Sequence, residues 1–503
     1  MHILSPASRY LCLDIDNDAP CRKLLVRDGD TLVYDLDVFL ATDPARVQCR
    51  MYVDMAPFFG KSLTFTLACD GGEEPYTPTC IDVRPDATDY SSPLRPLSHF
   101  TTRYGWTNDP NGLVYADGVY HMFYQHNPAG TRWGNMHWGH ATSPDLVHWT
   151  EQDEALYPDT TGTMYSGSAV ADMDNLSGLG DGTHTPILLY YTAAGENSLL
   201  SHGQPFTQRL AYSTDGGVTF HKYPDAMIPH IIGGNRDPKV VWAEELSCWL
   251  LALYLDGNEY ALFRSPDLLH WSEFQRLTLP MDAECPDFYP LTCIETNERL
   301  WVYSGASDTY IVGRLTEDGF VPIQENLRYQ LGGADSYAAQ TFFGTIRRIK
   351  IAWGRTGGDV FCGQMLFPTE VVLHKDPDGT YRLATDPVHE IETLYSDTAE
   401  PVAYDISLTI PAHAAPITGD ILGLPITIDP VENRMVLPGG RVIPLAYTAK
   451  EVYDVRMLVD TISLEVFADG GRIYTVQAVR PNMTDTVRLP GATVHRLAPI
   501  WNR

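Results

Sequence analysis

Trp106-Thr107-Asn108-Asp109-Pro110-Asn111-Gly112 is the stretch around which the rest of the chain is organised. Pro110 biases Asp109 toward an extended backbone, and Asn111-Gly112 is a turn signal. Two apolar runs follow, 113–115 and 120–124, with Asp117-Gly118 between them. The pattern predicts a β-hairpin with Asp109 at its mouth. On this stretch alone, Asp109 is explained equally well as a simple turn former.

Two further acids occupy similar places. Asp237 precedes Pro238 in Arg236-Asp237-Pro238, and Glu284 stands just ahead of a proline in Glu284-Cys285-Pro286. Each is followed by an apolar run, a turn and a second apolar run, which is the signature of a hairpin. Three carboxylates at proline-marked entrances are hard to explain as three unrelated turns.

A coarse repeat extends this pattern from about residue 96 to 387. Five hairpin openings, at Asp109, Ser166, Asp237, Glu284 and Asp335, lie 57, 71, 47 and 51 residues apart. Repetition at this period, with several strands per unit and almost no helical periodicity, predicts a five-bladed β-propeller. The first strand of each blade lines the central channel, so the geometry would gather Asp109, Asp237 and Glu284 at one mouth.

Short strands separated by Asp, Gly and Pro flank this region on both sides. We therefore expect an all-β protein with three domains: a small N-terminal β-sandwich over 1–95, the propeller over 96–387, and a C-terminal β-sandwich over 388–503. A chain of 503 residues exceeds what one hydrophobic core serves.

Composition narrows the partners and the compartment. The formal net charge of −29 disfavours nucleic acid and anionic membrane surfaces and suits a neutral substrate. No apolar run approaches membrane-spanning length, and the N-terminus shows no signal-peptide pattern. Nine cysteines without a CxxC motif favour reduced thiols in a cytoplasmic protein and argue against structural zinc. The sequence is compatible with a homo-oligomer but fixes no oligomeric state.

Two carboxylates suffice to cleave a glycosidic bond, one as an acid toward the leaving oxygen and one as nucleophile or base. The acid needs a raised pKa, and we expect neighbouring carboxylates to supply it. Aromatic floors and polar walls suit a sugar; those that the sequence offers near the openings include Trp106, Tyr124, Trp133, Trp138, Tyr165, Phe288, Tyr289, Trp353, Asn108, Gln125, Asn127, Arg236 and Asp335. For any single aromatic, packing between blades is the simpler explanation.

Other candidate sites carry weaker signals. His137 and His140 lack a matching acid at ligand spacing, so we expect them to pack within a strand rather than to bind metal. Cys285 has no His/Asn arrangement that would make it a nucleophile. We find no Gly-rich phosphate loop. The sequence thus predicts neither a metal nor a cofactor.

The ordered motifs resemble those of glycoside hydrolase family 32, the β-fructofuranosidases, which include invertases, inulinases and levanases. The matching motifs are Trp106 to Gly112, Phe123-Tyr-Gln-His-Asn-Pro128, His137-Trp-Gly-His140, Tyr165-Ser-Gly-Ser168, Arg236-Asp-Pro238 and Glu284-Cys-Pro286; they cover roughly residues 96–370. The segment 458–470 also looks like the family's C-terminal sandwich.

The resemblance implies a retaining mechanism without a metal. By motif, Asp109 matches the nucleophile, Glu284 the acid/base and Asp237 the transition-state stabiliser. Asn108, Gln125, Trp133, Ser166 and Arg236 match residues of the fructose pocket, and Trp353 matches less securely. Tyr165 and Asp335 are our further candidates for the pocket.

Three positions depart from the family pattern. Thr107 stands for the usual Met, Ala283 stands where many members have an aromatic residue, and Phe367-Pro-Thr-Glu370 lacks the usual Arg. Ala283 is expected to open the leaving-group side. The N-terminal sandwich is an addition to simple invertases.

We therefore expect an exo-acting retaining β-fructosidase that acts on sucrose, fructo-oligosaccharides, inulin or levan. A fructosyltransferase on the same scaffold is the alternative, because only the acceptor differs. A non-catalytic fructan-binding protein would be expected to have lost a carboxylate, and the Asn-Asp-Pro-Asn-Gly motif argues against an inverting pentose-releasing propeller. Linkage preference and chain length are not encoded in these motifs.

Overall fold

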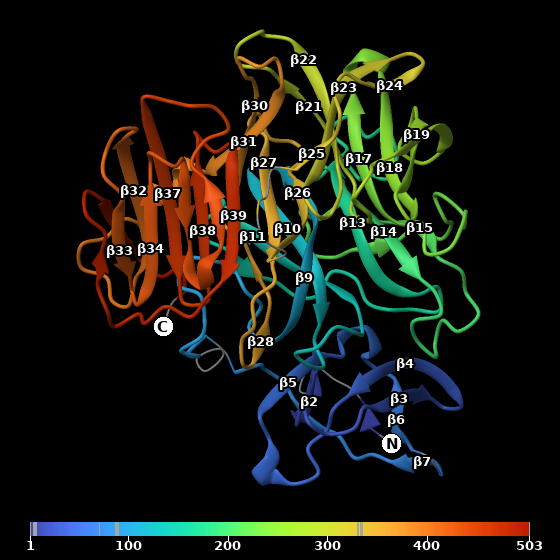
Figure 1. Cartoon of the computed structure of the whole chain (residues 1–503). Helices are drawn as coiled ribbons and strands as arrows, with labels where there is room; N and C mark the ends of the chain where they lie inside the picture. Colours follow the sequence, from blue (N-terminus) through green and yellow to red (C-terminus); the bar gives the residue numbers. More distant parts are fainter. Residues whose placement is uncertain are drawn as a thin grey trace.

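The computed structural model describes residues 2–3, 8–69, 71–85, 90–328, 331 and 335–501. It is an all-β protein in which a five-bladed propeller lies between two β-sandwiches, as predicted (Figure 1). The predicted domain limits at 95/96 and 387/388 lie between sheets. The helical segments in the described part are short 3₁₀ turns: η2 (Pro44–Arg46), η3 (Ala56–Phe58), η4 (Glu244–Leu246), η5 (His389–Leu394) and η6 (Pro438–Gly440).

Each blade is an antiparallel sheet whose strands follow one another in sequence. Their bounds in blade order are: β9 (Gly105–Ala116), β10 (Val119–Asn127), β11 (His137–Ser143), β12 (Thr150–Glu151); β13 (Thr163–Ala171), β14 (Ile187–Ala194), β15 (Thr207–Ser213), β16 (His221–Lys222); β17 (Arg236–Ala243), β18 (Cys248–Asp256), β19 (Glu259–Ser265), β20 (Ser272–Thr278); β21 (Asp287–Thr292), β22 (Arg299–Ser304), β23 (Thr309–Thr316), β24 (Gly319–Pro322), β25 (Leu327–Arg328); β26 (Ser336–Thr341), β27 (Ile349–Gly354), β29 (Gln364–Met365), β30 (Thr369–Lys375) and β31 (Tyr381–Pro387).

The blades close into a ring around their first strands. Strands β9, β13, β17, β21 and β26 contact one another in turn, and β26 returns to β9. A short strand between β27 and β29 of blade five, β28 (Phe361–Cys362), pairs in parallel with Gly105 and Trp106 of β9 and so joins the last blade to the first. Because side chains alternate between the two sides of a strand, each inner strand presents residues toward the central channel.

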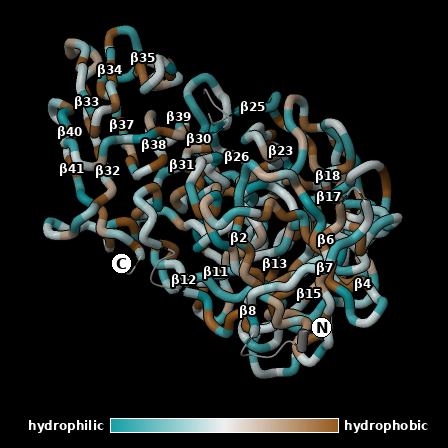
Figure 2. Tube along the Cα trace, turned by 90° about the horizontal axis from the view of Figure 1, so that it is seen from below, coloured by the Kyte–Doolittle hydropathy of each residue, from teal (hydrophilic) through white to brown (hydrophobic). Residues whose placement is uncertain are grey.

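The N-terminal sandwich lies below the propeller (Figures 1 and 2). Leu11, Leu24, Leu36, Met51 and Leu63 contribute to a core that the two facing sheets bury between them. One sheet holds β1 (His2–Ile3), β6 (Ser62–Cys69), β3 (Arg22–Asp28), β4 (Thr31–Val38) and β7 (Gly72–Pro75); the other holds β5 (Cys49–Asp54), β2 (Tyr10–Ile15) and β8 (Thr79–Ile81).

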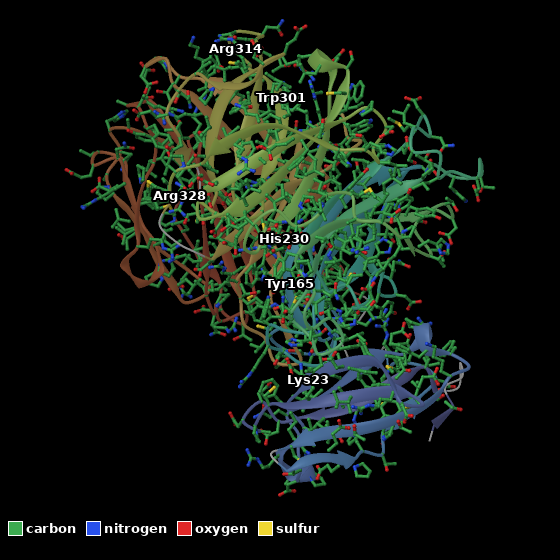
Figure 3. All side chains as sticks on the ribbon, turned by 90° about the vertical axis from the view of Figure 1, so that its right-hand side faces the viewer. Lys23, Tyr165, His230, Trp301, Arg314 and Arg328 are labelled. Carbon is green, nitrogen blue, oxygen red and sulfur yellow. The ribbon has the colours of Figure 1, made fainter. Side chains whose placement is uncertain are left out.

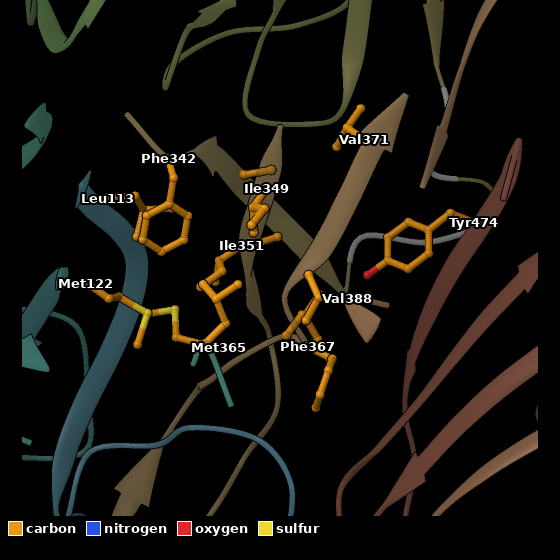
Figure 4. Close-up of a cluster of buried hydrophobic side chains, with 14 of the residues drawn as sticks. Leu113, Met122, Phe342, Ile349, Ile351, Met365, Phe367, Val371, Val388 and Tyr474 are labelled. Atoms are coloured by element: carbon orange, nitrogen blue, oxygen red, sulfur yellow. The ribbon is translucent and has the colours of Figure 1, made fainter. Parts of the chain in front are cut away.

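The C-terminal sandwich stands beside the propeller and shares a core with it. Figure 4 shows that core, which extends from Leu113 of blade one past Ile351 of blade five to Tyr474 of the sandwich on its far side. The strands of its two sheets are β39 (Ile473–Ala478), β38 (Ser463–Ala468), β37 (Val452–Asp460), β32 (Ala403–Pro411), β41 (Thr493–Leu497); and β36 (Val442–Pro444), β35 (Arg434–Val436), β34 (Leu424–Asp429), β33 (Ile417–Ile421), β40 (Val487–Arg488). This shared core makes the propeller and the C-terminal sandwich one packing unit.

The predicted turn at Asn111-Gly112 is wrong. Strand β9 runs through both residues, and its pairing with β10 shifts register between His121 and Phe123 and again between Tyr124 and His126. Gly112 has a φ of 53°, so the positive-φ residue serves a bulge within the strand. The hairpin itself turns at Asp117-Gly118, between the two apolar runs from which it was predicted.

Among the described helical segments, none has both the length and the apolar character needed to cross a bilayer.

Candidate active site

A cavity of about 420 Å³ opens at one mouth of the propeller channel. Of the eleven residues assigned to catalysis or to the fructose pocket, ten line it: Asn108, Asp109, Gln125, Trp133, Tyr165, Ser166, Arg236, Asp237, Glu284 and Trp353. They come from all five blades: from the openings of inner strands and the loops beside them, and, for Gln125 and Trp353, from the ends of the second strands β10 and β27. Sequence reasoning did not place Phe206, Gly234, Cys285 or Tyr337 in the wall.

Asp109 projects from β9 toward blade two. The Ser166 hydroxyl donates a hydrogen bond of 2.6 Å to its Oδ2 atom. Burial raises the pKa of the Asp109 carboxyl, hydrogen bonds from Ser166 and Asn108 act to lower it, and the nearby charge of Glu284 raises it again. The hydroxyl and amide donors thus favour the ionised form that a nucleophile needs.

Asp237 lies deepest of the three carboxylates, with an exposed fraction of 4%. Burial raises its pKa to about 7, although the adjacent Arg236 charge opposes the shift. The backbone N–H of Cys285 donates to Asp237 Oδ2 at 2.9 Å, and the Asp237 N–H donates to Thr192 Oγ1 at 3.0 Å. Both contacts fix the carboxyl beside the cavity.

Glu284 is held from two sides. Arg236 Nη2 donates to its Oε1 at 2.6 Å, and the Tyr337 hydroxyl donates to its Oε2 at 2.5 Å. Burial acts to raise the pKa of Glu284, but these two hydrogen bonds and the Arg236 charge leave it below its ordinary value. The prediction of a raised pKa is therefore wrong for Glu284 in this structure, because a cation and a phenol, rather than carboxylates alone, surround this acid.

Several residues at or near the cavity have strained backbone conformations. Asp237, Glu284, Cys285 and Ala338 have φ values of 66°, 59°, 35° and 52°, and a non-glycine residue in this region costs about 1–3 kcal/mol. Cys285 joins the carboxylates: its thiol lies 3.4 Å from Asp109 Oδ2 and 3.5 Å from Asp237 Oδ2. The thiol thus connects two acids that lie far apart in the sequence.

Asp335 does not line the cavity, which corrects its predicted place. Its Oδ2 atom accepts a hydrogen bond of 3.1 Å from the backbone N–H of Ala478 in the C-terminal sandwich and lies 3.7 Å from Arg441. Tyr337, two residues later, faces the cavity instead. The fifth blade opening was placed correctly, but Asp335 lies just before β26, which begins at Ser336, and its side chain contacts the C-terminal sandwich.

Aromatic side chains form part of the wall of the cavity. Trp133 is 54% exposed and meets the edge of Tyr165 at 6.0 Å between ring centroids. Trp353 has a buried indole N–H without a partner among the described residues, which leaves a donor for a ligand hydroxyl. The other aromatic candidates do not line the cavity: Trp106 contacts the Trp353 ring, while Tyr124, Trp138, Phe288 and Tyr289 are buried in the blades. Asn127 also lies outside the wall and accepts and donates hydrogen bonds in the loop after β10.

His137 and His140 take part in packing contacts. His137 Nε2 lies 2.5 Å from the Tyr34 hydroxyl, and His140 Nε2 lies 3.1 Å from His121 Nδ1. Burial lowers the pKa of both imidazoles. Within the described residues, no group of three or more His, Cys, Asp or Glu side chains is arranged to hold a metal ion.

Comparison with known families and proteins gives a consistent result. Residues 99–379 match the model described as the glycosyl hydrolases family 32 N-terminal domain. A levanase of Bacillus subtilis (strain 168) is 29% identical over 499 residues, covering 83% of this chain and 72% of the levanase. An invertase of Schizosaccharomyces pombe is 36% identical over 277 residues, covering 50% of this chain and 47% of the invertase.

Solved structures share the fold. The exo-inulinase of Aspergillus awamori superposes with a TM-score of 0.72 at 24% identity, covering 82% of this chain and 100% of the exo-inulinase chain. The whole exo-inulinase chain is thus matched by part of this chain. The family match begins at residue 99, after the strands of the N-terminal sandwich.

Proposed function

Because this chain belongs to glycosyl hydrolase family 32, we propose that it is a retaining β-fructofuranosidase that releases terminal fructosyl units from sucrose, fructo-oligosaccharides or fructans. One observation carries the proposal: Asp109, Asp237 and Glu284, from three blades, line a single cavity with polar and aromatic walls. Such walls suit the hydroxyls and C–H faces of a furanose ring, and the volume admits a sugar unit or two.

The first step forms a fructosyl-enzyme. Glu284 gives its proton to the glycosidic oxygen as the bond between that oxygen and the anomeric carbon breaks, and an Asp109 oxygen bonds to the anomeric carbon. In the second step water attacks that carbon, Glu284 takes the water proton, and Asp109 leaves as a carboxylate. Positive charge develops on the ring in both transition states, and the ionised form of Asp237 stabilises it.

Substrate binding reconciles the lowered pKa of Glu284 with its role as an acid. In this structure Arg236 donates to Glu284. A sugar hydroxyl that accepts this hydrogen bond withdraws the guanidinium from the carboxylate, and the sugar also displaces water. Both changes disfavour the ionised carboxylate, so the pKa of Glu284 rises when the substrate is bound.

The stereochemistry of the product tests the mechanism. NMR of the first-formed fructose should show the β anomer before mutarotation, because two displacements at one carbon restore its configuration. Asp109→Ala should reduce kcat by at least about 10⁴-fold while binding of fructose, measured by calorimetry, persists. An inverted product, or an active Asp109→Ala variant, would refute the proposal.

Product analysis on sucrose, inulin and levan side by side addresses the substrate range. Free fructose as the main product at high sucrose concentration is expected for a hydrolase. Accumulation of fructosyl oligomers would assign the chain to the transferases instead, since the covalent intermediate is common to both reactions.

A further inference from the structure

Strand β4 of the N-terminal sandwich holds two loops of the propeller. The buried Asp35 carboxylate accepts hydrogen bonds from the backbone N–H groups of Leu199 and Leu200, both at 3.1 Å. Lys23 Nζ lies 3.3 Å from the same carboxylate. These contacts hold the loop between β14 and β15, and Figure 3 shows Lys23 on the part of the sandwich nearest the propeller, with Tyr165 above it.

The same strand holds a second propeller loop, between β10 and β11. The Asn135 side chain forms two hydrogen bonds of 2.8 Å with the Asp37 backbone, one to its N–H and one to its C=O. Asn135 has a φ of 49°, so the loop turns sharply where it is gripped. Nearby, Arg132 lies over the Phe39 ring of the sandwich at 4.6 Å.

The loop between β10 and β11 carries a residue of the aromatic wall of the cavity, and the loop between β14 and β15 contacts another. Trp133 stands between Arg132 and Asn135 in the loop after β10. Tyr165, which meets the Trp133 edge, donates from its hydroxyl to Asn197 Oδ1 at 3.3 Å in the other loop. A side chain that is 54% exposed has little packing of its own, so its position depends on the loop that bears it.

We propose that the N-terminal sandwich is a positioning domain for the Trp133–Tyr165 wall and thereby sets the affinity for the fructoside. Asp35 and Asn135 are positioning residues, because they touch the loops and not the cavity. Freed loops would have to be ordered each time a sugar binds, and the entropy of that ordering weakens binding. The inference rests on the proposed function and gives a role to the part of the chain that precedes the family match.

Steady-state kinetics on sucrose and inulin with the full chain test this role. Asp35→Ala and Asn135→Ala should each raise KM about fivefold to tenfold while kcat changes less than about twofold, because binding rather than chemistry is affected. Glu73→Ala is the matched control. It breaks an exposed ion pair with Arg27 inside the same sandwich, on the edge strand β7, and should leave KM unchanged.

A double-mutant cycle separates positioning from general stability. In a Trp133→Ala background, Asn135→Ala should change KM by less than about twofold, since the wall through which it acts is already gone. Equal KM effects in both backgrounds, or unchanged KM with only a lower unfolding temperature, would overturn the inference. Asp35→Asn provides a second variant of the same shape should Asp35→Ala fail to fold.

Failure of the positioning role can be distinguished from failure of the proposed function. If the wild-type chain does not hydrolyse either sugar, the proposed function fails. Calorimetric titration of fructose into the wild type and the same variants then tests positioning alone: weaker binding by Asp35→Ala and Asn135→Ala supports it, and equal binding refutes it.

Discussion

Tyr337 and Arg236 together hold the pKa of Glu284 below its ordinary value against the effect of burial. Each donates to a different oxygen of the carboxylate, and a donor to the ionised form lowers a pKa. Asp237, by contrast, is buried with a more distant cation, its Oδ2 atom 3.8 Å from Arg236 Nε, and its pKa is raised to about 7. The pKa values of two neighbouring acids in one cavity are thus shifted in opposite directions, that of Glu284 downward by its donors and that of Asp237 upward by burial.

Tyr337→Phe should raise the pKa of Glu284, since the ionised carboxylate loses a donor while its protonated form loses little. The limb of the kcat/KM profile at which Glu284 loses its proton should move to higher pH by about 1–2 units, the equivalent of one hydrogen bond to a charged group. The measurement is kcat/KM on sucrose against pH for variant and wild type, because this profile reports groups of the free enzyme.

Tyr260→Phe supplies the matched control for that profile. The Tyr260 hydroxyl donates to the backbone carbonyl of Glu284 at 3.3 Å, not to its carboxylate, so its removal should leave the limb in place. An unshifted limb in Tyr337→Phe, or an equal shift in both variants, would show that the phenol does not control this acid.

The sequence placed the acids at the cavity but could not assign their pKa values. Motifs and blade openings locate Asp109, Asp237 and Glu284, because position in a propeller follows from repeat phase. The pKa of Glu284 depends instead on the side-chain geometry of Arg236 and Tyr337, which lie 48 and 53 residues away along the chain. The exchange of Asp335 for Tyr337 has another cause, because residues two apart share one side of an extended strand. Asp335 precedes β26, which begins at Ser336, and it contacts Ala478 of the C-terminal sandwich. Strand boundaries are the part of a sequence-based prediction that is least well defined.

Strand β9 shows the corresponding limit for single elements. A two-residue hairpin and a β-bulge both call for a residue with positive φ, so Asn-Gly within an apolar run fits either. The structure uses Gly112 for the bulge and Gly118 for the turn, with φ values of 53° and 87°. Only the pairing partner across the sheet distinguishes the two, and that information is not local.

Gly112→Ala should lower both stability and turnover. A Cβ atom at this position would lie 2.6 Å from the Phe123 ring and 3.2 Å from Trp138, so the bulge would have to shift, and Asp109 lies three residues away on the same strand. We expect a loss of about 2–4 kcal/mol in the free energy of unfolding, from backbone strain and overpacking together. Denaturant titration and kcat on sucrose measure the two effects.

Gly118→Ala isolates the packing part of that loss. Gly118 also has positive φ, but a Cβ atom added there would have no described neighbour within 4 Å, so only the backbone strain of about 1–2 kcal/mol remains. Turnover should be unchanged. Equal losses in the two variants would mean that the contact with Phe123 is readily relieved.

At the scale of the whole molecule, the sequence predicted the number of blades and both sandwiches. Repeat spacing and strand alternation are local signals that survive in any context, which explains this success. The pairing of β28 with β9 that closes the ring was not foreseen, because a two-residue strand carries no periodicity. Nor was the network that joins the propeller to the C-terminal sandwich, whose members are scattered over some 370 residues of sequence.

His99 lies at the centre of that network. Its Nδ1 atom lies 2.8 Å from Asp460 and its Nε2 atom 2.7 Å from Glu465, with all three side chains fully buried. Asp460 also accepts hydrogen bonds from the backbone N–H groups of Leu97 and Ser98. Burial alone would lower the pKa of His99, but the hydrogen bonds to the two carboxylates raise it to about 9, so the network holds an imidazolium between two acids.

His99→Gln should cost about 3–5 kcal/mol in the free energy of unfolding at pH 6, since it leaves buried carboxylates without their cation. The folded pKa of His99 exceeds its ordinary value of 6.5, so the stabilisation is complete below that value and is lost as pH rises through about 9. Denaturant midpoints at pH 6, 7.5 and 9.5 should therefore show a difference between wild type and variant that shrinks with pH. His148→Gln, which alters a half-exposed pair with Asp145, should change stability by less than about 1 kcal/mol; a His99→Gln deficit that is constant over this range would mean that the imidazole is neutral in the folded protein.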